Sequence, residues 1–181
     1  MRRSRDTRYH LAEFLGPPAF RCAAPWRSRH MRFTNVISIN RSLDQVFDYL
    51  IHFENIPRWN YAITETRMIT DGPVCVGSRY VQTRTIPSPS TESFEITAFE
   101  PRSGFSLSGD LGPFAAHVSY ALQPTADATV LTNTMDLRAA GPRRLVARLA
   151  APGIESAVAA NLGVLKNLLE NGDADTLGRR H

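Results

Sequence analysis

The sequence predicts an α+β domain in which about seven antiparallel strands form one sheet against a long C-terminal helix. Three observations support this prediction. Turn signals rich in Gly and Pro recur about every ten residues between residues 61 and 138, which is typical of an antiparallel meander. Apolar residues then follow a helical period over residues 143–170. Two short helical segments stand between the first strand and this meander.

The first strand and helix are indicated by two different periods. Residues 33–40 alternate as a strand, one side of which carries Phe33, Asn35, Ile37 and Ile39. Ser42 begins a helix, because Gln45 stands at the spacing of a capping box. The buried stripe of this helix is Val46, Phe47 and Leu50. Residues 52–60, which contain Pro57 and Trp59, predict a short second helix.

The remaining strands and the last helix follow in order. The predicted strands are residues 61–69, 77–86, 91–99, 105–108, 113–123 and 129–138. The fourth is short because Gly109-Asp110 is a turn signal. Pro142 suits the first turn of the last helix and Asn171-Gly172 its end. Its longest stretch without charge, residues 156–165, is far below the roughly 18 residues that span a bilayer, so we expect a core-facing helix.

Composition indicates an ordinary globular protein. The chain has 181 residues, 43% of them hydrophobic and 21% charged, enough for one domain that needs neither disulfides nor a metal. Cys22 and Cys75 are isolated, which fits a reducing cytoplasm. The sequence contains no phosphate-binding loop, no metal-ligand spacing and no Ser/His/Asp or Cys/His set that spacing supports. We therefore expect no cofactor and no metal.

The net charge of +4 is unevenly distributed. Residues 1–30 hold seven of the 21 basic and two of the 17 acidic residues, so the rest of the chain is close to neutral at −1. A nucleic-acid-binding domain should carry its positive charge on its folded face, which argues against that function. Lys166 is the one lysine among the basic residues, a bias that suggests a GC-rich bacterial genome.

Three segments are expected along the chain. Residues 1–30 lack any regular period and contain no unbroken apolar core of a signal peptide. We expect them to be a disordered extension, or the product of an upstream start codon wrongly chosen, because Met31 stands immediately before the first strand. Residues 31–172 form the ligand-binding domain, and residues 173–181 a disordered tail.

Short motifs along the domain add a family resemblance. They are Ile37-Ser38-Ile39-Asn40, Val46-Phe47-Asp48-Tyr49-Leu50, Glu54-Asn55-Ile56-Pro57-Arg58-Trp59, Gly77-Ser78-Arg79-Tyr80, Phe99-Glu100-Pro101, Tyr120-Ala121-Leu122-Gln123-Pro124 and Leu165-Lys166-Asn167-Leu168-Leu169-Glu170. With the element order, they resemble the START-like helix-grip superfamily (SRPBCC), in its polyketide cyclase/dehydrase and lipid-transport branch. The resemblance spans residues 31–171. It implies a curved sheet wrapped around the C-terminal helix, with a cavity for a small apolar ligand between them, but it defines no catalytic set. Ala128-Thr129 departs from the Gly-Thr that members often have before the last strand.

The predicted ligand-binding residues are those on inward registers of the strands and on the apolar side of the last helix. They are Trp59, Phe94, Phe105, Phe114, Val118, Tyr120, Asn133, Met135, Val158, Leu162 and Leu165. Trp59 either closes the mouth of the cavity or belongs to the core. His117 lies on the opposite register from Tyr120, so we expect it to face solvent despite its suitability as a general base.

Three polar residues are the weak catalytic candidates, and each has a structural alternative. Tyr120 is either a ligand contact or a core tyrosine. Asn133 either binds ligand or makes a structural hydrogen bond, because an unpaired buried amide costs about 1–3 kcal/mol. Arg84 is ambiguous, since either the register of Tyr80 and Arg84 or the register of Val81 and Thr83 faces inward. We favour an exposed Arg84 paired with a glutamate of the next strand, Glu92 or Glu95.

Three functions are compatible with these features. The favoured one is a cytoplasmic binding protein for a lipid, quinone or polyketide-like metabolite, without stable membrane insertion. A polyketide cyclase or dehydratase would act in the same cavity through the three polar candidates. An interaction module would use a face of small residues on the last helix, Ser156, Ala160 and Gly163, although close packing on its own sheet explains that face better. We expect a monomer or a homodimer.

Overall fold

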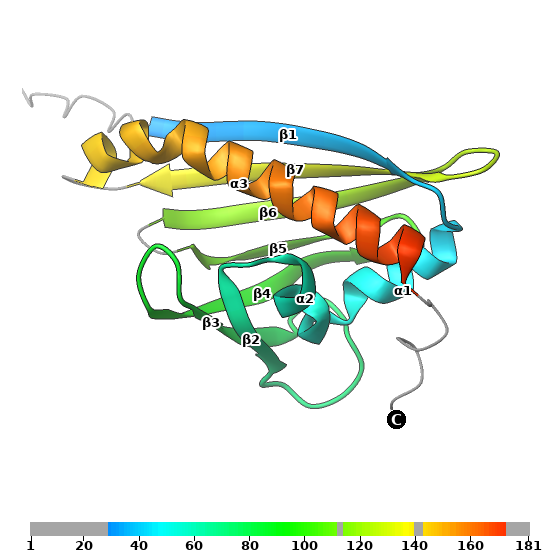
Figure 1. The fold of residues 1–181 in the computed structure, drawn as a ribbon. Coiled ribbons are helices and arrows are strands. Elements are labelled where there is room, and N and C mark those ends of the chain that lie inside the picture. Colours follow the sequence, from blue (N-terminus) through cyan, green and yellow to red (C-terminus); the bar gives the residue numbers. More distant parts are fainter. Residues whose placement is uncertain (1–28, 112–113, 140–142, 173–181) are drawn as a thin grey trace, which may run out of the picture.

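One antiparallel sheet organises the protein. The computed structural model describes residues 29–111, 114–139 and 143–172 (Figure 1). In this part of the chain the strands are β1 (Arg29–Ile39), β2 (Ile63–Met68), β3 (Arg79–Arg84), β4 (Ser90–Glu100), β5 (Gly104–Leu111), β6 (Phe114–Pro124) and β7 (Thr129–Ala139). Their order in the sheet is β1-β7-β6-β5-β4-β3-β2. From β2 to β7 each strand pairs with the next one along the chain, which confirms the predicted meander, and β1 adds the last edge beside β7.

Capping residues and proline determine where the short helices begin. They are α1 (Leu43–Ile51), the 3-10 turn η1 (Phe53–Asn55), α2 (Ile56–Trp59) and α3 (Arg143–Asn171). The predicted capping box of α1 is present: Gln45 N donates to Ser42 Oγ at 3.4 Å, and Ser42 N donates to Gln45 Oε1 at 3.3 Å. The predicted second helix is in fact η1 followed by the single turn α2, because Pro57 lacks an N–H and is accommodated only in a first turn.

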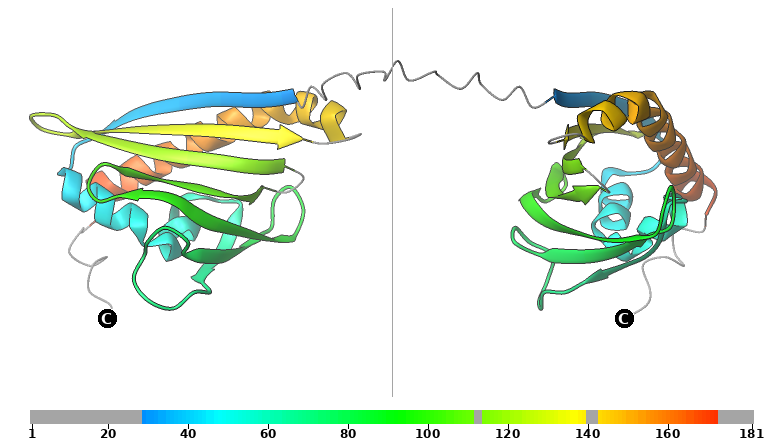
Figure 2. Two further views of the ribbon diagram at one scale, coloured as in Figure 1. Left: turned by 180° about the vertical axis from the view of Figure 1, so that it is seen from behind. Right: turned by 90° about the vertical axis from the view of Figure 1, so that its left-hand side faces the viewer.

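The sheet is strongly curved around the helices, as predicted. Seen end-on, the strands bend into an arc, and α1, α2 and α3 lie on its open side (Figure 2). α3 runs along β1 and contacts α2. Asn161 Nδ2 on α3 donates a hydrogen bond to Asn60 Oδ1, at the C-terminal end of α2, at 3.1 Å. The architecture is therefore a helix-grip fold.

One strand is longer than predicted. β5 continues through Gly109-Asp110, which the sequence indicated as a turn. Gly109 pairs with Phe94 on β4 and with Ala116 on β6. A Cβ atom at Gly109 would lie 2.6 Å from Phe94 Cα and 2.1 Å from Ser93 O, so the glycine serves a close approach of two strands.

The first strand begins earlier than predicted. β1 begins at Arg29, and Arg29 and His30 pair with Ala139 and Arg138. The first strand therefore starts two residues before Met31. Residues 1–28 of the predicted extension and residues 173–181 of the predicted tail lie outside the described residues.

Two apolar clusters fill the concave side. The larger one, called here the proximal cluster because it contains α1, comprises Ile39, Val46, Phe47, Tyr49, Leu50, Phe53, Trp59, Tyr80, Phe94, Ile96, Phe105, Leu122, Leu131, Leu162, Leu165 and Leu169. The distal cluster comprises Phe33, Phe114, Ala116, Val118, Met135 and Leu137. The division of the interior into two clusters decides where a ligand site can be.

Candidate ligand-binding site

The predicted ligand-binding residues divide between the two clusters. Trp59, Phe94, Phe105, Leu162 and Leu165 lie in the proximal cluster, where Trp59 is a buried core residue. Phe114, Val118 and Met135 lie in the distal cluster. Tyr120 and Val158 pack against both. The inward registers of β6 and β7 are therefore as predicted.

Three side chains at the junction of the clusters remain partly accessible to solvent. Leu107, Tyr120 and Val158 pack against both clusters and remain only half-buried, although they lie on inward registers or on the sheet-facing side of α3. By contrast, Leu131 and Leu165 are completely buried within the proximal cluster. Solvent thus reaches side chains at the centre of the concave face, which is what an open internal site requires. Leu107 was not among the predicted site residues, although the alternation of Phe105-Ser106-Leu107-Ser108 places it on the same side of the strand as Phe105.

Tyr120 and Asn133 lie at this junction. They are directly opposite each other in the β6–β7 ladder. The ring of Tyr120 stacks on that of Phe105 with a centroid separation of 4.9 Å. Burial raises the pKa of Tyr120 above a usual value at which the phenol is already protonated at neutral pH. Asn133 is completely buried.

Arg84 lies on the inner face, and the favoured prediction of an exposed side chain is wrong. Tyr80 and Gln82 are buried on the same register, so this side of β3 faces inward. Arg84 Nε donates to Glu92 Oε1 at 2.6 Å, and Gln82 Nε2 donates to Glu92 Oε2 at 2.8 Å. The Arg84 and Glu92 side chains are 11% and 2% exposed. The predicted partner Glu92 is therefore correct, but the ion pair is buried and not exposed. The two charges can be buried because they are paired with each other.

Four aromatic side chains pack against one another in the proximal cluster. The ring of Phe53 lies 4.7 Å from that of Tyr80, 5.6 Å from Phe94 and 5.3 Å from Phe105. Burial raises the pKa of Tyr80 to about 12, with a smaller contribution from Glu54 and Cys75. Sequence reasoning missed Phe53 and left the register of Tyr80 open. Phe53 falls in the 3-10 turn, where neither helical nor strand periodicity marks a buried position.

The outer face of the sheet carries a separate polar row. His117 is exposed, as predicted, and its Nδ1 lies 2.9 Å from Ser108 Oγ. Asp136 is the cross-strand neighbour of His117 on β7. These residues are on the convex side, away from both apolar clusters, so they contribute nothing to the interior site.

Other sites and surfaces are limited in the part of the chain that the structure describes. It holds no group of three His, Cys, Asp or Glu residues arranged for a metal ion, and no helix long and apolar enough to cross a membrane. On α3, Ser156 and Ala160 are exposed, and a Cβ atom at Gly163 would meet nothing within 4 Å. The small-residue face therefore does not pack on the sheet, contrary to the preferred explanation.

The gripped helix and the apolar interior define the class: a START-like helix-grip protein. The chain belongs to the family described as polyketide cyclase / dehydrase and lipid transport, which matches residues 30–170. No curated protein matches the sequence.

Solved structures share the fold at low sequence identity. A protein of Thermus thermophilus, TTHA0849, is 11% identical with a TM-score of 0.66, and the alignment covers 79% of this chain and 99% of that one. The di-domain ARO/CYC StfQ from the steffimycin biosynthetic pathway is 13% identical with a TM-score of 0.65; 78% of this chain aligns with 51% of StfQ. DynU16, a protein in the dynemicin biosynthetic locus, is 18% identical with a TM-score of 0.57; here 78% of this chain aligns with 48% of DynU16. At these identities the similarity shows the fold alone.

Proposed function

We propose that this protein binds a small hydrophobic metabolite, a lipid, quinone or polyketide-like molecule, between the sheet and α3. The observation that carries the proposal is the half-buried state of Leu107, Tyr120 and Val158, which are inward-facing yet in contact with both apolar clusters. A filled core would bury such side chains, whereas a ligand site leaves them accessible until the ligand covers them. The family description, which includes lipid transport, supports the same class of ligand.

The candidate contacts follow from this proposal. Val118, Met135 and Phe114 form the distal wall, and Phe105 and Phe94 form the proximal wall. Val158, Leu162 and Leu165 of α3 cover the site from the opposite side. Trp59 supports the proximal wall from within the core. These side chains are apolar, so ligand affinity should come mainly from buried area.

A cyclase or dehydratase acting in the same site is the second candidate function. It is favoured by Tyr120, a protonated phenol directed into the interior, and by the polyketide cyclases among the structural neighbours. Such catalysis needs a group that moves a proton and one that orients a carbonyl. Arg84 is bound to Glu92 and is therefore not directed at a ligand. We rank the cyclase second for this reason.

Native mass spectrometry of the protein as purified from cells tests the two functions. A retained lipid, quinone or aromatic metabolite would support binding. Incubation of the same protein with a linear polyketone analogue then separates the alternatives: an accelerated release of water and ring closure, lost in Tyr120→Phe, would establish the cyclase. An unchanged analogue that remains bound would support carriage.

A further inference from the structure

A row of polar side chains crosses the inner face of the sheet at the junction of the apolar clusters. Asn133 on β7 is the cross-strand partner of Asn35 on β1 and of Tyr120 on β6. The three residues therefore lie side by side on adjacent strands. Asn133, in the middle, is completely buried, and its two neighbours are half-buried.

Apolar side chains flank this row on both sides. Along β7, Asn133 stands between Leu131 of the proximal cluster and Met135 of the distal cluster. Along β6, Tyr120 stands between Leu122 and Val118 in the same way. A molecule that spans both clusters along β6 or β7 passes over this row.

The amide of Asn133 has no hydrogen-bond partner within the described residues. Neither its Nδ2 nor its Oδ1 is bonded, and Asn35 Nδ2 is also unpaired. Each such buried group costs about 1–3 kcal/mol unless a partner satisfies it. Tyr120, the cross-strand neighbour of Asn133, carries a hydroxyl that is protonated at neutral pH and can donate a hydrogen bond beside this amide. Donors and an acceptor are thus held unused at one place in the interior.

We propose that Asn133 is a specificity-determining residue that binds a neutral oxygen, a carbonyl or hydroxyl, placed between two apolar parts of the ligand. The inference rests on the proposed binding function. An amide can donate to a carbonyl and also accept from a hydroxyl, and Tyr120 supplies a further donor. Arg84, the cation on the inner side of β3, is paired with Glu92 and is therefore not available to a carboxylate. A fatty acid, with its charged oxygens at one end, fits this arrangement poorly.

A matched pair of small molecules tests the inference. Benzophenone has a carbonyl between two phenyl rings, and diphenylmethane has a methylene in its place. Each competes against the neutral fluorescent probe N-phenyl-1-naphthylamine bound to the full-length protein. We expect benzophenone to bind at least about tenfold more tightly, because an unsatisfied amide rejects the analogue that lacks the oxygen. Laurate should compete no better than diphenylmethane.

Variants assign the preference to Asn133. Asn133→Leu should bind both compounds alike, with the change confined to benzophenone. Thr132→Val, on the opposite side of the same strand, should keep the wild-type preference. Equal binding of benzophenone and diphenylmethane to the wild type, tighter binding of laurate, or a preference that survives in Asn133→Leu would each overturn the inference while leaving the binding function intact. Failure of the fluorescent probe itself to bind would overturn both. The wild-type comparison decides the matter even where Asn133→Leu does not fold.

Discussion

Arg84 Nε and Glu92 Oε1 lie 2.6 Å apart on the concave face of the sheet, where both side chains are nearly removed from solvent. A pair of this kind contributes less by its own attraction than by what its loss leaves behind. Removal of the cation leaves Glu92 as a buried anion that still accepts a hydrogen bond from Gln82.

Arg84→Met should therefore lower the free energy of unfolding by about 3 kcal/mol, near the lower end of the range for a broken buried pair. The additional change Glu92→Gln should recover much of this loss, because the buried charge is removed. Arg79→Gln, at an exposed position on the same strand, is the control. Urea denaturation measures all three. A loss below about 0.5 kcal/mol for Arg84→Met would mean that the pair is solvated in the folded protein.

Two glycines should respond in opposite directions to the same change. Gly109→Ala should destabilise the protein by about 3 kcal/mol or more, because the new Cβ meets the backbone of β4. Gly163→Ala should stabilise it by about 0.5–1 kcal/mol, since α3 is open there and alanine favours the helix. Thermal unfolding compares the two variants. Similar, small effects at both positions would contradict the close approach of β4 and β5.

The different roles of glycine explain one limit of sequence analysis. Gly109-Asp110 has the composition of a turn, but the glycine permits strand pairing there, and composition does not separate these cases. In β3 both registers carry polar residues, so alternation could not orient Arg84. Only the neighbouring strand, which places Glu92 opposite Gln82, decides the register.

The longer strands were more informative. In residues 114–123 the large apolar side chains Phe114, Val118 and Leu122 share one register with Tyr120, so the inward side of Tyr120 follows directly from the sequence. The row formed by Asn35, Asn133 and Tyr120 could not be predicted from the sequence in this way. It depends on β1 lying beside β7, a pairing of segments about 100 residues apart. A sheet order of this kind follows from the fold as a whole.

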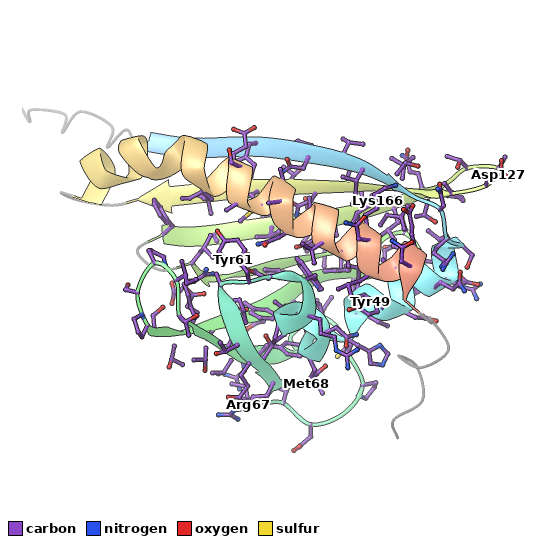
Figure 3. The ribbon with its side chains drawn as sticks, viewed as in Figure 1. Tyr49, Tyr61, Arg67, Met68, Asp127 and Lys166 are labelled. Atoms are coloured by element: carbon purple, nitrogen blue, oxygen red, sulfur yellow. The ribbon has the colours of Figure 1, made fainter. Side chains whose placement is uncertain are left out.

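The C-terminal end of α3 is attached to the turn after β1 by Glu170. Its Oε1 accepts hydrogen bonds from Asn40 N at 2.7 Å and from Lys166 Nζ at 2.9 Å, and Lys166 also donates to Ser38 O. Lys166 lies near this end of α3 in Figure 3. The hydrogen bond from Asn40, followed by the contact with Lys166, lowers the pKa of Glu170.

The lowered pKa of Glu170 predicts that this residue stabilises the folded protein less as the pH falls. The contribution of Glu170 is complete above the pKa of a glutamate in the unfolded chain, about 4.3, and it is lost as the pH falls through the lower folded value. Glu170→Gln should be less stable than the wild type at neutral pH, and the difference should shrink as the pH falls to about 3. Glu155→Gln, which removes an exposed carboxylate of the same helix, is the matched control. Melting temperatures across this range measure the effect, and a constant difference for Glu170→Gln would contradict it.

Filling the interior should separate binding from stability. Ala116 faces inward beside Leu137 in the distal cluster. If the neighbouring space is a ligand site, Ala116→Leu should weaken probe binding by about tenfold or more while costing less than the roughly 1–3 kcal/mol of an overpacked core. Ala115→Leu, next along β6 and exposed on the outer face, should change neither property. Strong destabilisation by Ala116→Leu with unchanged binding would mean that the distal cluster is packed solid.

The central claim is that the concave face of the sheet holds a site for a small apolar molecule, and a fluorescence titration of the wild-type protein with N-phenyl-1-naphthylamine tests it most directly. The account predicts saturable binding at one site per chain, with a dissociation constant on the order of micromolar and a blue-shifted emission from a dry environment. Emission that rises without saturation, or that does not differ from the probe in buffer, would contradict the claim.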